Sequence, residues 1–291
     1  MSRLETITGS SWAPSLAPTE LARAIDALEA GQVLFFPQLS FALETAERRF
    51  LADDWSAAAK NISYELVRHA LSGTKAVGED AAGLKRLMSR YARASQELIE
   101  AVIPAYRGQL ELARTSFRPI EIAGRSSSPR HDDTRLHIDA FPSRPTAGQR
   151  ILRVFSNIDP NGQARVWRVG TPFETVARQF HMRLSKPWPG SAWAHSALGL
   201  TKGRRRDYDH YMLQLHDAMK LDDRYQSESA FEELCFPAGA TWMVFTDQVP
   251  HAALAGRHAL EQTFHLDTSK MKHPERSPLR VLEGLAGRRL A

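Results

Sequence analysis

One stretch of the sequence places two metal-ligand side chains two residues apart. His137 and Asp139 lie in the run LHIDA, which is predicted to be a strand. Because side chains two residues apart on a strand point to the same face, an imidazole and a carboxylate would converge there. His251, just after a late predicted strand, is far enough downstream to be folded back as a third ligand. Two imidazoles and one carboxylate are typical of non-haem Fe(II) oxygenases, which keep positions open for a 2-oxo acid and O2.

A His-x-Asp motif also arises by chance, and the chain contains a second copy at His265 and Asp267. Only His273 follows that copy, with no room for strands that would bring another ligand, so we expect His265 to be a structural strand residue. We expect other histidines to be exposed or structural rather than ligands: His131, His195, His216 and His258. The single Cys235 cannot form a disulfide within the chain, and we expect it to be a small buried apolar residue.

Arginines within predicted strands are candidates for binding an acidic cosubstrate. A charged side chain in a strand core is costly unless it meets an anion, and a guanidinium binds a carboxylate through paired hydrogen bonds. The distal carboxylate of a 2-oxo acid such as 2-oxoglutarate needs such a partner. The candidates are Arg118, Arg153, Arg165 and Arg168. Arg165 shares a face with Trp167 by the period of two, which favours this pair, and a solvent-facing position is the alternative for each arginine.

The elements that must position these residues change along the chain. Residues 1–113 are predicted to be mainly helical, with one helix opening at Pro18, a longer one after Gly83 and a short strand at 33–36. Residues 114–267 are predicted to form strands, with a helical insertion near 205–222. The predicted strands are 120–122, 136–138, 151–155, 165–169, 241–245 and 262–266. The turn formers DPNG at 159–162 predict a hairpin between the strands on either side. This order favours an α+β fold with a double-stranded β-helix (jelly-roll) core.

Composition limits the class of protein. The 291 residues are 43% hydrophobic and 24% charged, which predicts one soluble globular domain over 1–291. We find no apolar run long enough to span a membrane and no signal peptide, so a cytoplasmic location is expected. The net charge of +5 is mildly attractive to anions. Residues 268–291 form a basic tail that carries Lys270, Lys272, Arg276, Arg280, Arg288 and Arg289 against Glu275 and Glu283.

Several of these stretches resemble the Kdo hydroxylases, which act on 3-deoxy-D-manno-oct-2-ulosonic acid (Kdo) in lipopolysaccharide. The longest is DDTRLHIDAFPSRP at 132–145, and others lie at 60–64, 114–119, 150–157, 167–170, 208–212 and 245–248. The resemblance implies a jelly-roll dioxygenase that depends on Fe(II), 2-oxoglutarate and O2, and that hydroxylates Kdo on lipid A at carbon 3 while releasing succinate and CO2. On matching positions it implies iron at His137, Asp139 and His251. It also implies that Arg118, Arg153, Arg165 and Trp167 line the pocket for cosubstrate and substrate.

Other functions are compatible with the same residues. A zinc hydrolase could use these three ligands and keep one position for water. A binding protein of the cupin kind is a non-enzymatic alternative. The basic run at 202–206 (KGRRR) lacks interleaved aromatic residues, so we interpret it as a solvated loop and expect no nucleic-acid partner.

The tail itself allows two interpretations. Ser277 and Pro278 are a plausible helix start, after which Leu279, Leu282, Leu285 and Leu290 can share one side. With Arg280, Arg288 and Arg289 this pattern could form a basic amphipathic helix that contacts the anionic surface of the inner membrane, where a lipid A acceptor would lie. In the alternative, the helix packs its leucines on the core.

Overall fold

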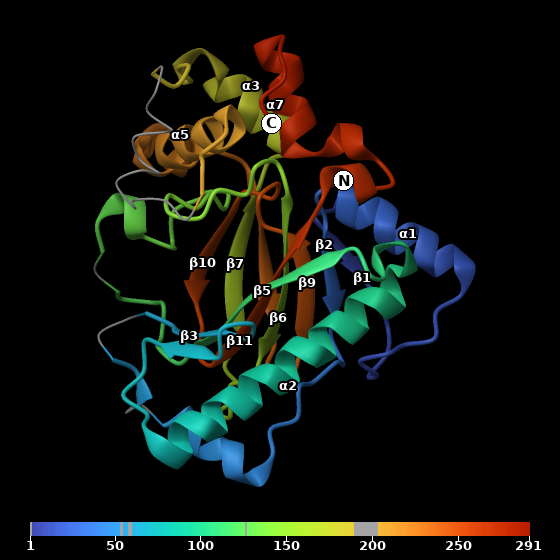
Figure 1. Ribbon diagram of the computed structural model, residues 1–291, viewed down its shortest axis with the longest axis vertical. Coiled ribbons are helices and arrows are strands. Elements are labelled where there is room, and N and C mark those ends of the chain that lie inside the picture. Colours follow the sequence, from blue (N-terminus) through green and yellow to red (C-terminus); the bar gives the residue numbers. More distant parts are fainter. Residues whose placement is uncertain (1, 53–54, 58–59, 126, 189–202) are drawn as a thin grey trace.

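The computed structural model describes the whole chain except residues 1, 53–54, 58–59, 126 and 189–202 (Figure 1). Its strands form two sheets. The strands are β1 (Leu4–Thr6), β2 (Val33–Phe36), β3 (Ile62–Glu65), β4 (Ala70–Ser72), β5 (Leu110–Arg118), β6 (Arg150–Asn157), β7 (Arg165–Gly170), β8 (Phe231–Phe236), β9 (Thr241–Phe245), β10 (His251–Ala255) and β11 (Ala259–Leu266). The larger sheet has the order β1-β2-β9-β6-β11-β5-β3-β4, and the smaller one the order β10-β7-β8.

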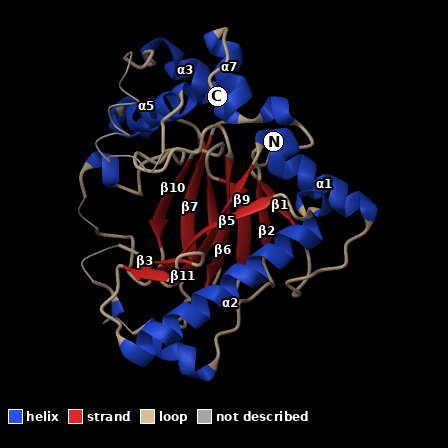
Figure 2. Cartoon of the chain, in the orientation of Figure 1, coloured by secondary structure: helices blue, strands red, loops and turns tan. Residues whose placement is uncertain are grey.

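Helices cover the larger sheet on one side and collect above the strand ends. The α-helices are α1 (Pro18–Glu29), α2 (Gly78–Val102), α3 (Phe173–Phe180), α5 (Asp207–Leu221), α6 (Asp223–Glu228) and α7 (Pro278–Ala286). Figure 2 shows α1 and α2 running across the sheet, while α3, α5 and α7 lie together at one end of the strands. The helix that begins at Pro18 ends before Gly31, which has a φ of +82° that glycine adopts without strain.

The apolar core is divided among these layers. Side chains of α1 and α2 pack on Leu152, Met243 and Phe264 of the larger sheet. Between the two sheets, Trp167 of the smaller sheet packs with Phe155 and Trp242 of the larger one. Two facing antiparallel-rich sheets with helices on the outside make this an α+β fold with a jelly-roll core, as expected from the order of elements.

Several local predictions were wrong. The first 113 residues contain the expected helices and the expected strand at 33–36, but β1, β3, β4 and the start of β5 were not predicted there. These strands are three or four residues long apart from β5, too short to show a clear alternation. Residues 120–122 form no strand, and around His137 only one isolated bridge to His251 is present. Helices α3 and α6 and strand β10 were not predicted.

The hairpin predicted at 159–162 is also wrong. Strand β6 pairs with β9 on one side and β11 on the other, so both of its edges are occupied. The chain therefore crosses to the smaller sheet, where β7 pairs with β8 and β10. The turn itself exists, and Asp159 stabilises it by accepting hydrogen bonds from the backbone N–H groups of Asn161 and Gln163.

The structure decides between the two interpretations of the tail. Leu279, Leu282 and Leu290 are buried among the side chains of α3, α5 and α6. Ser277 caps α7 by accepting a hydrogen bond from the backbone N–H of Arg280. The leucines of the tail therefore pack on the core, as the second interpretation expects. No helix among the described residues is both long and apolar enough to cross a bilayer.

Cys235 differs from its prediction as well. It lies on β8 and is exposed, because the alternation of this strand turns Leu234 and Phe236 inward and Cys235 outward.

We predict that Leu282→Ala lowers the free energy of unfolding by about 2–4 kcal/mol, because it removes a side chain that is 2% exposed and leaves a cavity. Urea denaturation followed by circular dichroism measures this change. Leu221→Ala is the matched control, since Leu221 is 46% exposed and its truncation should change little. Equal, small effects of both substitutions would contradict the packing of α7.

Candidate metal centre

Backbone pairing brings His137 and His251 together. The N–H of His137 donates to the carbonyl of His251 at 3.0 Å, and the N–H of His251 donates to the carbonyl of His137 at 2.8 Å. Asp139 is held by a third bond, from its N–H to the carbonyl of Thr246 at 2.8 Å. The segment that contains the His-x-Asp motif thus lies beside the start of β10. Only an isolated bridge, and not a regular strand, holds it there.

The three side chains converge. One ligand atom each of His137, Asp139 and His251 can be chosen so that all lie within 4.8 Å of one another, and all three residues are buried. In the described part of the chain this is the single cluster of histidine, cysteine and acidic side chains with that spacing. The structure therefore brings the motif and the distant histidine together, and their role as metal ligands stays a prediction.

Both imidazoles are oriented by their backbone. Nδ1 of His137 lies 2.7 Å from the carbonyl oxygen of Arg135, and Nδ1 of His251 lies 2.9 Å from that of Val249. Because a carbonyl only accepts, Nδ1 must carry the proton in each ring, which leaves Nε2 with a free lone pair. Burial lowers the pKa of both histidines, so both are neutral near pH 7.

The carboxylate of Asp139 is held in its charged form. Burial by itself raises the pKa of Asp139, but the nearby charge of Arg153 outweighs burial and lowers it below its ordinary value. Oδ2 of Asp139 lies 3.1 Å from Nη2 of Arg153, yet it accepts no well-aligned hydrogen bond from the described residues. Two neutral imidazoles and one ionised carboxylate with an unused lone pair fit a divalent iron.

Two of the predicted arginines share one buried carboxylate. Nε of Arg118 donates to Oε2 of Glu261 at 2.8 Å, and Nη1 of Arg153 lies 3.1 Å from Oε1 of the same side chain. Glu261 is on β11, at the centre of the larger sheet. Arg118 and Arg153 therefore lie at the site as expected, but their charges are already compensated.

Arg165 is the exception among these arginines. It is 2% exposed, and it has one long hydrogen bond of 3.4 Å to the carbonyl of Gly256. Its Nε has no partner in the described structure. Burial, followed by the charge of Arg118, lowers its pKa to about 9, so it remains a cation at neutral pH. A buried guanidinium without a carboxylate is costly unless an anion joins it.

Trp167 lies beside Arg165 on the same face of β7, as predicted. Its ring stacks on that of His251, with centroids 5.1 Å apart and planes 23° apart. Arg168 is on the opposite face, with its guanidinium 4.5 Å from the ring centroid of Phe231. The period of two therefore separates the arginine that faces the site from the one that does not.

The remaining histidines are placed outside the cluster. His265 on β11 has its Nδ1 3.3 Å from the carbonyl oxygen of Arg150, which supports a structural role. His131 contacts Ser128, and His258 stacks on Phe117. His195 lies outside the described residues, and so does Lys202, the first residue of the basic run at 202–206. No group of ligands forms around the second His-x-Asp copy in the part of the chain that is described.

Sequence reasoning missed three residues of α5 and β11 that lie at the site. His216, expected to be a lone structural histidine, packs edge-on against His137 with ring centroids 5.6 Å apart. Lys220, one helical turn further, is buried. Both lie on the apolar stripe that contains Met212, and a polar residue on such a stripe is the signal that could have identified them. Glu261, in the middle of a buried strand, was marked by the same kind of mismatch.

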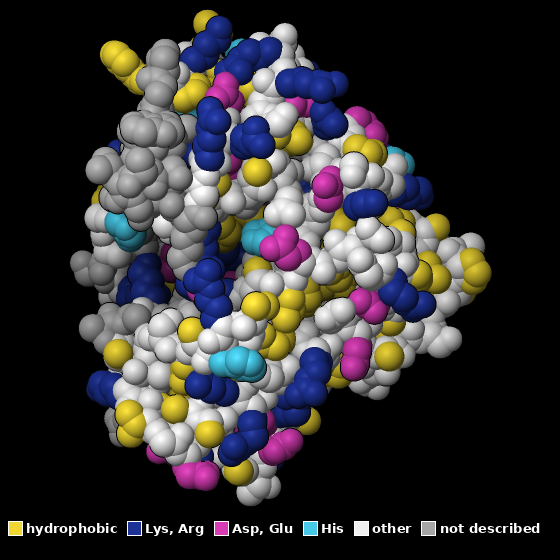
Figure 3. Space-filling model, in the orientation of Figure 1, with side chains coloured by type: hydrophobic (Ala, Val, Ile, Leu, Met, Phe, Trp, Pro, Cys, Tyr) yellow, Lys and Arg dark blue, Asp and Glu magenta, His cyan; other side chains and the backbone are white. Residues whose placement is uncertain are grey.

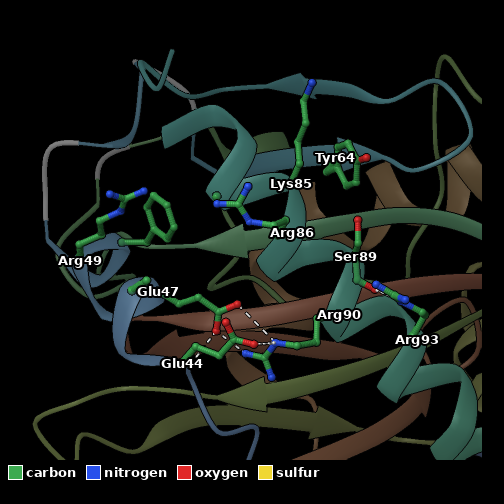
Figure 4. Close-up of a pocket in the computed structure, with 12 residues that line it drawn as sticks. Glu44, Glu47, Arg49, Tyr64, Lys85, Arg86, Ser89, Arg90 and Arg93 are labelled. Carbon is green, nitrogen blue, oxygen red and sulfur yellow. Dashed lines mark hydrogen bonds and ion pairs between the residues drawn. The ribbon is translucent and has the colours of Figure 1, made fainter. Parts of the chain in front are cut away.

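Cavity size does not locate this site. A hollow of about 480 Å³ lies between residues 44–50 and α2, lined by Arg49, Lys85, Arg86, Arg90 and Arg93, and Figure 4 shows Arg90 pointing to Glu44 and Glu47. This basic groove contains none of the three ligand residues. On the face shown in Figure 3, basic and acidic side chains are interspersed, so the small positive charge is not gathered into one block there.

Comparisons with known proteins agree with the geometry. The family model of 3-deoxy-D-manno-oct-2-ulosonic acid (Kdo) hydroxylase matches residues 11–289. A crystal structure of the Kdo hydroxylase KdoO, a non-haem Fe(II) alphaketoglutarate dependent dioxygenase, in complex with alphaketoglutarate and Fe(III) is 48% identical, with a TM-score of 0.96 over 99% of this chain and 97% of that one.

Two further structures of KdoO are equally similar. The complex with cobalt(II) is 48% identical with a TM-score of 0.97, and the complex with succinate and Fe(III) is 47% identical with a TM-score of 0.96; each covers 99% of this chain and 97% of the other. No curated protein sequence matches this chain. The match of the family model over nearly the whole length shows that this chain belongs to the Kdo hydroxylase family.

Proposed function

We propose that this protein hydroxylates Kdo at carbon 3, in a reaction that consumes O2 and 2-oxoglutarate and releases succinate and CO2. Family membership supports the reaction class, and relatives at 47–48% identity are described with iron, alphaketoglutarate and succinate. The observation that carries the proposal to particular residues is the buried cluster of His137, Asp139 and His251. Trp167 stacks on His251 and shares a face of β7 with Arg165, a buried cation that has no ion pair with a described residue.

The three clustered residues are the proposed iron ligands. Fe(II) held by two imidazoles and one carboxylate would supply oxygen activation, with coordination positions left for the 2-oxo acid and O2. Before the metal binds, the protein presents Nε2 of two neutral imidazoles, those of His137 and His251, and the ionised carboxylate of Asp139. Arg153 orients the carboxylate, and Trp167 restricts the ring of His251 by stacking on it.

Arg165 is the proposed anchor for the distal carboxylate of 2-oxoglutarate. Arg118 and Arg153 already have Glu261 as a partner, whereas Arg165 has no acidic partner within ion-pair distance among the described residues. A carboxylate would accept paired hydrogen bonds from Arg165 and satisfy its unpartnered Nε. Arg118, Arg153 and Trp167 then line the same pocket, with Arg118 kept in place by its ion pair.

Neither alternative function has comparable support. Zinc could occupy the same ligands, and a binding protein could use the same pocket. A zinc hydrolase, however, would leave the buried guanidinium of Arg165 without an anionic ligand, and the family is one of hydroxylases.

The proposed acceptor is Kdo carried on lipid A, which would bring the enzyme to the anionic inner membrane. Since the leucines of α7 are buried, such contact must rest on charge. In the tail, Lys272, Arg280 and Arg288 are paired with Asp26, Glu283 and Asp207. In the basic groove on α2, Lys85, Arg86 and Arg93 have no ion pair with a described residue, so this groove is the proposed contact surface.

We expect His251→Ala and Asp139→Asn to abolish both iron binding and succinate formation, because each removes one of three ligands. Iron bound per chain after anaerobic reconstitution and succinate released with Kdo-lipid A measure the two effects. His265→Ala is the control and should keep both. Fe(II) should restore activity to chelator-treated protein and Zn(II) should not. Full iron loading of His251→Ala would refute the proposed ligand set.

We expect Arg165→Met to weaken binding of 2-oxoglutarate by tenfold to more than a hundredfold, since charged hydrogen bonds contribute roughly 1.5–3 kcal/mol. Anaerobic titration calorimetry of the iron-loaded protein measures the dissociation constant. Arg168→Met, on the opposite face of the same strand, should bind 2-oxoglutarate as the wild type does. An unchanged constant in Arg165→Met, with a loss in Arg118→Met or Arg153→Met, would move the anchor to that arginine.

We expect the wild-type protein to sediment with phosphatidylglycerol vesicles at low salt and to be released at high salt, since each basic residue contributes about 1 kcal/mol near an anionic surface. Arg86→Glu with Arg93→Glu should remain in the supernatant. Lys270→Glu with Arg289→Glu changes the same number of charges on the tail and should sediment. The reverse order of the two double variants would place the contact on the tail.

A further inference from the structure

Lys220 is a buried lysine that the proposed chemistry does not yet use. It lies near the C-terminal end of α5 and is 2% exposed. Its Nζ donates one hydrogen bond, to the carbonyl oxygen of Arg130 at 3.2 Å, and forms no ion pair with a described residue. An ammonium group can donate three hydrogen bonds, and a buried charge without a counter-ion is costly. The position therefore suits a residue that meets an anionic ligand.

Lys220 lies on α5, one helical turn from a residue that contacts a proposed iron ligand. One turn earlier on the same helix, His216 packs its ring against His137. The face of α5 that carries His216 and Lys220 thus covers the metal site on the side of His137.

The other cations around the site already have partners or a proposed ligand. Arg118 and Arg153 are paired with Glu261, and Arg165 is assigned to 2-oxoglutarate. Lys60 lies 3.2 Å from the carboxylate of Asp133 and also donates to the carbonyl of His131. Burial lowers the pKa of Lys220, and the nearby charge of Asp133 acts against burial by favouring the charged form. Among these cations, Lys220 has neither an ion-pair partner in the described structure nor an assigned ligand.

The chemistry of the substrate sets where its carboxylate must lie. In a 3-deoxy-oct-2-ulosonic acid, carbon 1 is the carboxylate, carbon 2 carries the glycosidic oxygen or keto group, and carbon 3 is the methylene to be hydroxylated. The carboxylate is thus two bonds from the reacting carbon, and both must lie close to the metal at the same time. A cation that binds the sugar's acid group must consequently be adjacent to the metal ligands rather than at the pocket rim.

We propose that Lys220 binds the C1 carboxylate of the sugar acid and thereby sets which carbon faces the metal. This assignment rests on the proposed function, since it takes Kdo as the substrate. It makes Lys220 a specificity-determining residue: an acidic ulosonic sugar gains a charge-assisted hydrogen bond that a neutral sugar lacks. The hydrogen bond to the carbonyl of Arg130 holds the ammonium group in position when no substrate is bound.

The test combines a protein variant with a substrate variant. Lys220→Met keeps the length of the side chain and removes its charge, and Lys220→Arg keeps the charge. Binding of Kdo and of its C1 methyl ester to the iron- and 2-oxoglutarate-loaded protein is measured by anaerobic calorimetry, where no turnover occurs. Lys270→Met, an exposed lysine of the tail, is the matched control.

We expect the wild type and Lys270→Met to prefer Kdo over its ester by about tenfold or more. Lys220→Met should bind both alike and weakly, with an unchanged dissociation constant for 2-oxoglutarate and an unchanged melting temperature within a few degrees. Lys220→Arg should recover part of the preference for the acid. A Lys220→Met variant that still discriminates acid from ester as the wild type does would overturn the assignment.

The outcome is separable from that of the proposed function. If Kdo were not the substrate, the wild type would release no succinate in response to Kdo-lipid A, whatever the variants do. If only the role of Lys220 were wrong, the wild type would turn over and Lys220→Met would keep its Michaelis constant for the acceptor. A rise in that constant with little change in the constant for 2-oxoglutarate supports the proposal.

Discussion

The site depends on one pair of reciprocal backbone hydrogen bonds, between His137 and His251. These two bonds join an irregular segment to the first residue of β10, and they bring together ligands that are far apart in the sequence. Buried backbone groups must be paired, so this bridge holds the two segments of the chain together more firmly than side-chain packing alone would. The bonds from each Nδ1 to a neighbouring carbonyl then leave Nε2 of both rings directed away from the backbone. The main chain thus preorganises the proposed metal site.

The second constraint is the balance of buried charge. Glu261 neutralises Arg118 and Arg153 from the middle of the larger sheet, and Asp139 shares Arg153. Arg165 and Lys220 are left as buried cations without an ion pair among the described residues. Because a lone buried charge is unfavourable, each marks a place where an anion stabilises the folded protein. In the proposed function, a dicarboxylate cosubstrate and an acidic sugar would supply the anions for these two positions.

The helices above the strand ends connect stability to the site. Leu136 and Ile138, on either side of His137, and Ala252, next to His251, are buried with the side chains of α3, α5 and α7. Helix α5 carries His216 and Lys220 toward the ligands, and α7 packs its leucines behind it. The C-terminal helix therefore supports α5, the element that covers the proposed metal site, by packing its apolar side on the core.

The sequence by itself determined the candidate ligand residues, the position of Arg165 and Trp167 on one face of a strand, and helices α1, α2 and α5, since each depends on local spacing and periodicity. The order of helices and strands also indicated the jelly-roll class. The sequence could not determine which strands become neighbours. The edges of β6 are taken by β9 and β11, so the turn at 159–162 joins two sheets instead of forming a hairpin. The roles of Glu261, His216 and Lys220 likewise arise from long-range packing and burial, which place charges beside one another that no spacing along the chain relates. Only the tertiary structure shows that Arg118 and Arg153 have an acidic partner and that Arg165 has none among the described residues. Ion pairs depend on contacts in space, which the order of residues along the chain does not reveal.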